Sequence, residues 1–330
     1  MYSTERINWI DWAKVFAIYL VVLGHLLQPI GSEGRMHDFI YLFHMPFFFF
    51  ISGYLFKVKE TREGDVFKRI IRSLLIPYLL LNLVSQLFLV PSWIMSRQIP
   101  IENFYYIAIA DCRGEAGPTW FLICLEWVWV IAWLLLKYSR KIQYAVLAAC
   151  AVAAYFFPFH LYWRIDTALM VLPFFMIGYY LKGKIRFGLK LSGVVFVLCL
   201  IATLALATVM GDTNTYLREY GRYPLLYYPA AFTGIFMLIA FCSMLNGRRV
   251  RVIQVLSTGT ILIMALHGVA VLYIKSVLKH LCGIMFDDYI LWQKILLAVV
   301  VLALLYYSII LVQKHAPVLM GNRGKRGTKQ

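Results

Sequence analysis

The chain has 330 residues, of which 62% are hydrophobic and 15% are charged, and its mean hydropathy is +0.74. These values exclude an ordinary soluble domain and indicate a polytopic membrane protein. The formal net charge of +16 is typical of basic loops on the cytoplasmic side of a membrane, so we do not expect a nucleic-acid partner. The six cysteines have no spacing typical of a metal site, and the sequence predicts no bound metal.

The apolar runs predict about ten membrane helices, counted at about 20 residues per span. These runs are continuous rather than alternating with a period of two, which argues against strands and predicts an all-α fold. Most of the 32 lysines and arginines lie in alternate connections, so the positive-inside rule places both termini in the cytoplasm. The expected helices lie near residues 9–29, 37–56, 70–95, 118–137, 143–160, 165–182, 189–210, 225–246, 256–280 and 289–313.

The first apolar run, Asn8–Gln28, carries Lys14 and His25. Because a helix advances about 1.5 Å and 100° per residue, these two side chains are about 16 Å apart along the axis and only about 20° apart around it. An ionisable side chain inside a bilayer costs on the order of 2.5 kcal/mol or more, which favours a polar cavity along this face. His25 is therefore a candidate general base, and a buried imidazole bonded to a carbonyl is the alternative.

The second apolar run, 43–57, holds His44 and Pro46 in its outer half and Gly53 deeper. A proline in a membrane helix frees a backbone carbonyl, and a glycine allows another helix or a ligand to approach closely. Packing alone also explains Gly53. We regard His44 as a candidate substrate contact, together with Trp120 in a later helix.

Basic residues mark the start of the third helix, where Arg69 and Arg72 are three positions apart and share a face. Retention of positive charge on the cytoplasmic side explains them by itself. The functional interpretation is that paired guanidinium groups bind phosphate or pyrophosphate, which suits their fork geometry. This second interpretation predicts a phosphorylated donor that arrives from the cytoplasm.

Two further ionisable residues, Glu126 and His267, fall near the middle of the bilayer. An unpaired carboxylate at that depth is costly. Glu126 is therefore expected either to orient a catalytic imidazole or to pair with a buried cation. His267 is either part of the active site or the donor of a bond between helices.

Six blocks of the sequence, in this order, resemble the motifs of the integral-membrane acyltransferase 3 family, particularly its branch related to fucose O-acetylases. The resemblance covers nearly the whole chain, and it does not single out one acceptor. The blocks are IDWAKVFAIYLVVLGH, FHMPFFFFISGYL, RIIR followed by IPY, GPTWFLICLEW, LPFFMIGYYL and LSTGTILIMALHG.

The resemblance implies O-acyl transfer, usually of acetyl, from acyl-CoA in the cytoplasm to a sugar at or across a bacterial inner membrane. The family's Arg-x10-His pattern falls on Lys14 and His25, and its Arg-x-x-Arg pattern falls on Arg69 and Arg72. His25 is then the catalytic base, and the two arginines hold the phosphates of acetyl-CoA. Lysine in place of the first arginine keeps the charge but loses bidentate binding. His267 matches a family histidine.

We expect residues 1–313 to form the transmembrane acyltransferase domain and residues 314–330 to form a basic cytoplasmic tail attracted to anionic lipid. The expected partners are acyl-CoA, a saccharide or glycolipid acceptor, and membrane lipid. The main alternative is a transporter or flippase of a lipid-linked glycan, although the sequence contains no detectable inverted repeat. A non-catalytic membrane scaffold is a second alternative, and it leaves Lys14 and His25 unexplained.

Overall fold

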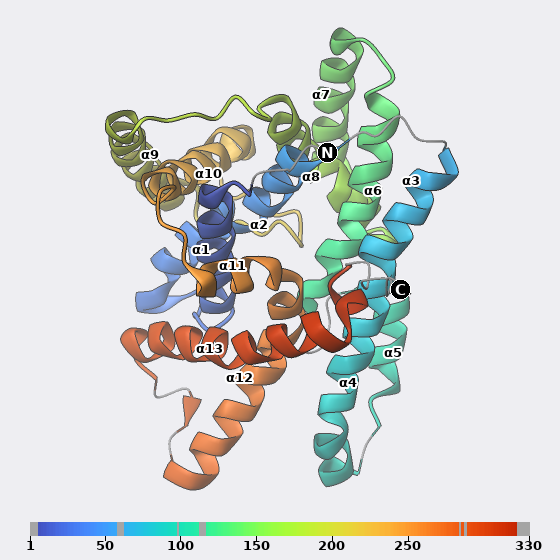
Figure 1. Cartoon of the computed structure of the whole chain (residues 1–330), viewed down its shortest axis with the longest axis vertical. Coiled ribbons are helices and arrows are strands. Elements are labelled where there is room, and N and C mark those ends of the chain that lie inside the picture. The colour runs from blue at the N-terminus through green and yellow to red at the C-terminus, as the bar shows by residue number, and fades with distance from the viewer. Residues whose placement is uncertain are drawn as a thin grey trace, which may run out of the picture. The chain divides into compact units, whose positions relative to one another are not determined.

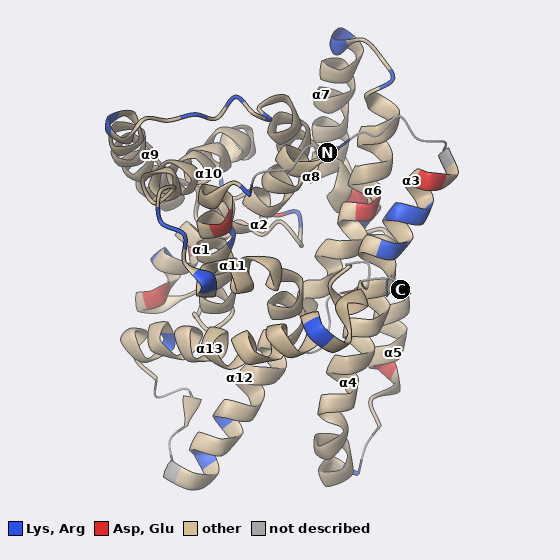
Figure 2. Cartoon of the chain, in the orientation of Figure 1, with Lys and Arg blue, Asp and Glu red and all other residues tan. Residues whose placement is uncertain are grey.

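The computed structural model describes residues 6–57, 63–97, 99–111, 117–283, 285–286 and 289–321. These residues form helices joined by loops and contain no strand, apart from an isolated bridge between Asn214 and Glu219. Seven helices are long and apolar enough to cross a membrane, and Figure 2 shows how few charged residues the long helices carry. The prediction of an all-α polytopic membrane protein is confirmed.

The chain divides into two compact units, each built from two separate stretches of sequence. Unit 1 consists of Met1–Phe56 and Met170–Thr260, and unit 2 consists of Lys57–Leu169 and Ile261–Gln330. Helix α8 (Ile165–Tyr180) contributes its first turn to unit 2 and the rest to unit 1. Each unit is therefore assembled from residues distant in sequence, and the two are described separately below.

Unit 1 is centred on α10, which packs against three other helices of the unit (Figure 1). The first helix, α1, also packs on α2 and on the short α11, and α2 packs on α9. The helices of the unit, besides most of α8, are α1 (Asn8–Gly24), α2 (Gly34–Leu55), α9 (Leu189–Met210), α10 (Tyr227–Met244) and α11 (Arg251–Thr258).

Two glycines allow α2 and α8 to approach each other at backbone distance. A Cβ added to Gly53 would lie 1.8 Å from the carbonyl oxygen of Phe175, and one added to Gly178 would lie 2.0 Å from that of Phe50. Small residues allow this kind of close helix contact in membrane proteins. Helix packing therefore accounts for Gly53.

Unit 2 begins with a long helical stretch, which contains a π-helical turn that joins α3 to α4 without a break. The turn packs on α3, α4 and α6, and the C-terminal 3-10 turn η7 packs on α4 and α13. The elements are α3 (Glu63–Ile70), the π-turn η2 (Ile71–Leu75), α4 (Ile76–Ser96), α5 (Ile101–Ala108), α6 (Trp120–Leu135), α7 (Arg140–Phe156), α12 (Thr260–Cys282), α13 (Leu291–His315) and η7 (Pro317–Met320).

Each of the ten expected apolar runs is helical, but the boundaries differ in two ways. Helices α1, α7 and α8 have 17, 17 and 16 residues, and none of the three is among the seven candidate membrane spans. The run expected as one helix over 256–280 is divided at Gly259 into α11 and α12. At this break the Ser257 carbonyl accepts hydrogen bonds from the Lys14 ammonium of α1 and from the Thr260 hydroxyl instead of continuing the helical ladder.

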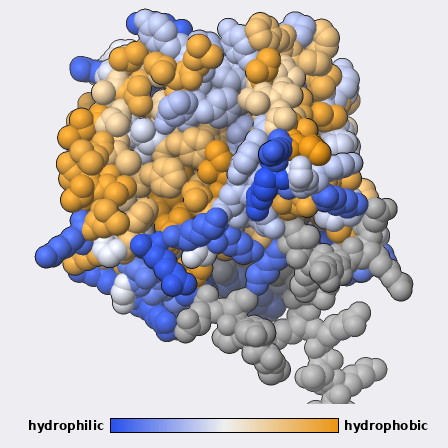
Figure 3. All heavy atoms as spheres, turned by 90° about the horizontal axis from the view of Figure 1, so that it is seen from above, coloured by the Kyte–Doolittle hydropathy of each residue, from blue (hydrophilic) through white to orange (hydrophobic). Residues whose placement is uncertain are grey.

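Large apolar side chains cover much of the surface, as Figure 3 shows for one face. Helix α9 is the clearest example, since only 17% of its most apolar stretch is buried. Its exposed residues are mostly aliphatic and include Val194, Val197, Leu198 and Ile201. Exposed aliphatic side chains along a long helix are expected where the helix faces lipid.

Candidate functional site

The residues predicted to carry the chemistry divide between the two units. Unit 1 contains three of them, Lys14, His25 and His44. Unit 2 contains the remaining five, which are Arg69, Arg72, Trp120, Glu126 and His267.

Lys14 lies near the N-terminal end of α1, where this helix packs on α11. Its ammonium Nζ donates a hydrogen bond of 2.5 Å to the carbonyl oxygen of Ser257. The neighbouring Asp11 carboxylate accepts bonds from the Ser257 hydroxyl at 2.6 Å and from the Arg6 guanidinium at 2.5 Å. A cation is favourable at the C-terminal carbonyls of a helix, so Lys14 has a structural role in joining α1 to α11.

His25 is the residue that caps the C-terminus of α1, and its side chain is exposed. Its ring lies edge-on to the ring of Tyr41 of α2, with centroids 6.4 Å apart. Gly24 makes room for this arrangement, since a Cβ there would lie 3.0 Å from the Tyr41 ring. The imidazole therefore lies beside an aromatic ring and is exposed.

Tyr41 contacts two further histidines of its own helix. It stacks on His37 with centroids 3.9 Å apart, and it meets His44 edge-on at 4.9 Å. His44 is buried, and its Nδ1 lies 2.8 Å from the carbonyl oxygen of Ile40. Because a carbonyl only accepts, Nδ1 carries the proton and Nε2 is the basic nitrogen. The structure thus brings His25 and His44 together around one tyrosine.

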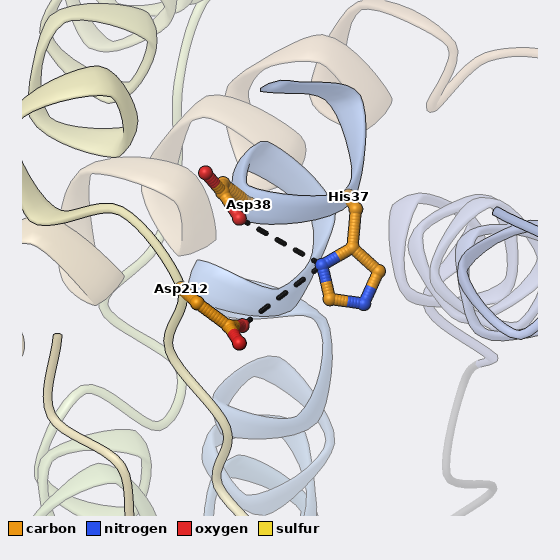
Figure 4. Close-up of side chains that lie close together, drawn as sticks. All are labelled: His37, Asp38 and Asp212. Atoms are coloured by element: carbon orange, nitrogen blue, oxygen red, sulfur yellow. Dashed lines mark ion pairs between the residues drawn. The ribbon is translucent and has the colours of Figure 1, made fainter. Parts of the chain in front are cut away.

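Four neighbouring residues were not predicted from the sequence: Tyr41, His37 and the two residues whose carboxylates lie beside His37, Asp38 and Asp212. The spacing of His37, Tyr41 and His44 is i, i+4, i+7, which places all three on one helical face. That spacing was a readable signal. No sequence signal pointed to Asp212, because this residue follows α9 and lies close to the start of α2 only in the folded chain (Figure 4).

A cavity of about 420 Å³ lies in unit 1 at the N-terminal end of α1. Its wall includes the rings of Trp9 and Tyr54 and the cationic side chain of Arg186. The Asn246 amide oxygen fixes one side of it by accepting a 3.0 Å bond from the Trp9 backbone amide.

In unit 2, the two predicted phosphate-binding arginines flank the junction of α3 and η2. Arg69 donates to the carbonyl oxygen of Lys57 at 2.9 Å, and its guanidinium lies over the ring of Trp129, 5.0 Å from the centroid. Arg72 is exposed and lies within the π-turn itself. π-Turns inside α-helices occur frequently at functional sites, and this one contains Arg72.

Glu126 and His267 occupy buried positions on α6 and α12. Oxygen Oε1 of Glu126 has no hydrogen-bond partner among the described residues. His267 Nδ1 lies 3.1 Å and 3.0 Å from the carbonyl oxygens of Ile263 and Met264 in its own helix. As in His44, this geometry makes Nδ1 the protonated nitrogen. Trp120, at the start of α6, is 5% exposed and packs into the core of unit 2.

Comparison with known proteins gives a match over most of the chain. The model of the acyltransferase 3 family, described as an acyltransferase domain, matches residues 7–313. The nodulation protein NolL of Mesorhizobium japonicum is 26% identical over 185 residues. That alignment covers 51% of this chain and 46% of NolL, so the chain spans about half the length of this relative. No solved structure is significantly similar to the chain.

The family match includes the helices that carry all eight predicted site residues, from Lys14 to His267. It also extends through both structural units. The chain therefore belongs to the acyltransferase 3 family of membrane proteins.

Proposed function

We propose that the protein is a membrane O-acyltransferase that moves an acetyl group from cytoplasmic acetyl-CoA to a hydroxyl of a cell-surface or lipid-linked saccharide. The observation that carries the proposal is the position of His25, an exposed imidazole at the end of α1 beside the ring of Tyr41. Membership of an acyltransferase family supports acyl transfer as the reaction class.

In the proposed reaction His25 is the general base. The neutral imidazole takes the proton of the acceptor hydroxyl while the hydroxyl oxygen attacks the thioester carbonyl carbon. The carbon–sulfur bond then breaks, and the imidazolium returns the proton to the departing CoA thiolate. The products are the acetyl ester and free CoA, so no acyl-enzyme is required.

The donor phosphates are assigned to Arg69 and Arg72. Their guanidinium groups suit bidentate contacts to phosphate oxygens, and the exposure of Arg72 leaves it accessible to a ligand. Glu126 and His267 are proposed as the further buried polar groups of the catalytic centre, and His44 and Trp120 as groups near the acceptor.

The first experiment measures transfer from labelled acetyl-CoA to a panel of glycans by the purified protein. We expect His25→Ala to lower the rate by at least about 10²-fold, the usual contribution of a general base, while acetyl-CoA affinity stays unchanged. The matched control is His280→Ala, which removes another exposed histidine, in α12. Wild-type turnover in His25→Ala, or glycan translocation without any transfer, would contradict the proposal.

The second experiment measures acetyl-CoA affinity in Arg69→Ala and Arg72→Ala. Loss of one hydrogen bond to a charged group costs about 1.5–3 kcal/mol, so we expect the Kd to rise by roughly 10-fold to 150-fold. Arg251→Ala, which removes an exposed arginine at the start of α11, is the control. Unchanged acetyl-CoA affinity in all three variants would mean that Arg69 and Arg72 serve only membrane topology.

A further inference from the structure

Three side chains with metal-ligand atoms converge in unit 1, at the end where α2 begins and α9 ends. His37 and Asp38 lie near the start of α2, and Asp212 follows the C-terminus of α9. The ligand atoms of the three residues all lie within 4.8 Å of one another. Figure 4 shows the imidazole Nδ1 facing both carboxylates.

The distances in this cluster suit a shared ion better than direct contacts. His37 Nδ1 is 3.7 Å from Asp38 Oδ1 and 4.0 Å from Asp212 Oδ1, beyond hydrogen-bonding range. Bonds from zinc to nitrogen or oxygen of about 2.0–2.2 Å place tetrahedral ligands roughly 3.3–3.6 Å apart. The ligand atoms of the three residues lie within 4.8 Å of one another, so side-chain movements of up to about 1.5 Å would bring all three groups to one cation.

The buried imidazole supplies a second and independent observation. His37 is 6% exposed, and its Nδ1 has no hydrogen-bond partner in the part of the chain that the structure describes. Its two carboxylate neighbours lie at ion-pair distance only, and a buried polar nitrogen that makes no hydrogen bond is unfavourable. Tyr41 stacks on the ring at 3.9 Å and holds its plane, so Nδ1 is aimed at the carboxylates by packing.

The loop that carries Asp212 is fixed by its own contacts. Gly211 has a φ of 66°, which ends α9 and turns the chain. The next residue, Thr213, is fully buried, and the Arg222 amide donates back to the Met210 carbonyl at 2.7 Å. Asp212 is thus presented by a loop that is anchored at both ends, as a preformed ligand requires.

From this geometry we infer that His37, Asp38 and Asp212 form a site for a divalent transition-metal ion of the zinc type. One imidazole nitrogen with two carboxylate oxygens matches such ions, whereas Ca²⁺ and Mg²⁺ prefer oxygen ligands alone. Asp212 is exposed, so the ion can enter from solvent, and three protein ligands leave a position for water or another oxygen. This inference does not depend on the proposed acyl transfer.

Metal content tests the inference without reference to activity. The full-length protein, purified without a polyhistidine tag, is stripped with EDTA, equilibrated with Zn²⁺, dialysed, and analysed by mass spectrometry for zinc. We expect about one zinc per chain and a rise in the apparent melting temperature, because an ion that binds only the folded state stabilises it. Absence of bound zinc in the wild type would overturn the inference.

Variants locate the site. Asp212→Asn and Asp38→Asn should weaken zinc binding by at least about tenfold, since even the loss of an outer-shell partner costs 10-fold to 100-fold. Glu219→Gln is the matched control, because Glu219 is an exposed carboxylate on the same loop. Unchanged zinc affinity in Asp212→Asn, or equal competition by Ca²⁺ or Mg²⁺, would contradict a site of this class.

Discussion

The phenol ring of Tyr41 stacks on the imidazole of His37, with centroids 3.9 Å apart and an interplanar angle of 22°. The same ring meets His25 and His44 edge-on. One side chain therefore links the proposed catalytic base to the proposed metal ligand. Because aromatic contacts of this kind restrict how a ring can rotate, Tyr41 is a positioning residue for His25.

Removing the Tyr41 ring should therefore slow transfer more than it weakens donor binding. We expect Tyr41→Leu to lower kcat by about tenfold or more, since small misplacements of a catalytic group cost that much or more. Tyr41→Phe keeps the ring and serves as the control, with kcat near the wild-type value. Acetyl-CoA affinity should be the same in both variants. A full rate in Tyr41→Leu would show that His25 needs no aromatic support.

The sequence was sufficient for the fold class and for much of the helix pattern, because long continuous apolar runs have few structural solutions in a membrane. The break at Gly259 was not predictable in the same way. It depends on the bond from Lys14 to the Ser257 carbonyl, and these residues are distant in sequence. The π-turn Ile71–Leu75 likewise leaves no trace in apolar periodicity.

In the candidate site, too, some features were predictable from the sequence and others depend on long-range packing. Lys14 and His25 were recognisable because helical geometry within one segment gives their relative direction. The convergence of His37 and Asp212 comes from the packing of α2 on α9, which pairs two parts of the chain that no local pattern connects. Sequence spacing therefore led to the prediction of no metal, and only the fold reveals this set of possible ligands.

A substitution at Lys14 can distinguish a structural role of this residue from a role in donor binding. Lys14→Met removes the charged hydrogen bond to the Ser257 carbonyl, and we expect a loss of about 1.5–3 kcal/mol in stability. Lys14→Arg keeps the charge and is the control. Thermal unfolding in detergent measures the loss of stability, and titration with acetyl-CoA measures whether donor binding also changes. Weaker donor binding at unchanged stability would instead assign Lys14 to the phosphates.

The glycine pair between α2 and α8 predicts a severe packing defect. Gly53→Ala places a Cβ 1.8 Å from the Phe175 carbonyl oxygen, and relieving this overlap should cost about 3 kcal/mol, the upper end of the usual cost of overpacking. We expect a lower apparent melting temperature and loss of monodisperse protein. Gly193→Ala in α9 is the control, since a Cβ there meets nothing within 4 Å, and replacing a helical glycine stabilises by up to about 1 kcal/mol. Equal behaviour of the two variants would refute the close crossing.

The C-terminal turn of unit 2 gives a test of how the π-turn is supported. Gly321 has a φ of 68°, and a Cβ added to it would lie 2.7 Å from the carbonyl oxygen of Ser73, next to Arg72 in η2. Gly321→Ala should therefore displace the turn that packs on α4 and disturb the geometry of Arg72. We expect weaker acetyl-CoA binding together with reduced stability.

Gly283→Ala is the matched control, because Gly283 also has a φ of 68° but a Cβ there meets nothing within 4 Å. That variant incurs only the left-handed backbone strain of about 1–2 kcal/mol. Both variants incur this backbone strain. The difference between them in stability and in acetyl-CoA affinity therefore reports the effect of the contact with Ser73. If both lower acetyl-CoA affinity equally, the contact does not support the π-turn. If only Gly321→Ala lowers it, the position of Arg72 depends on how the C-terminal turn packs.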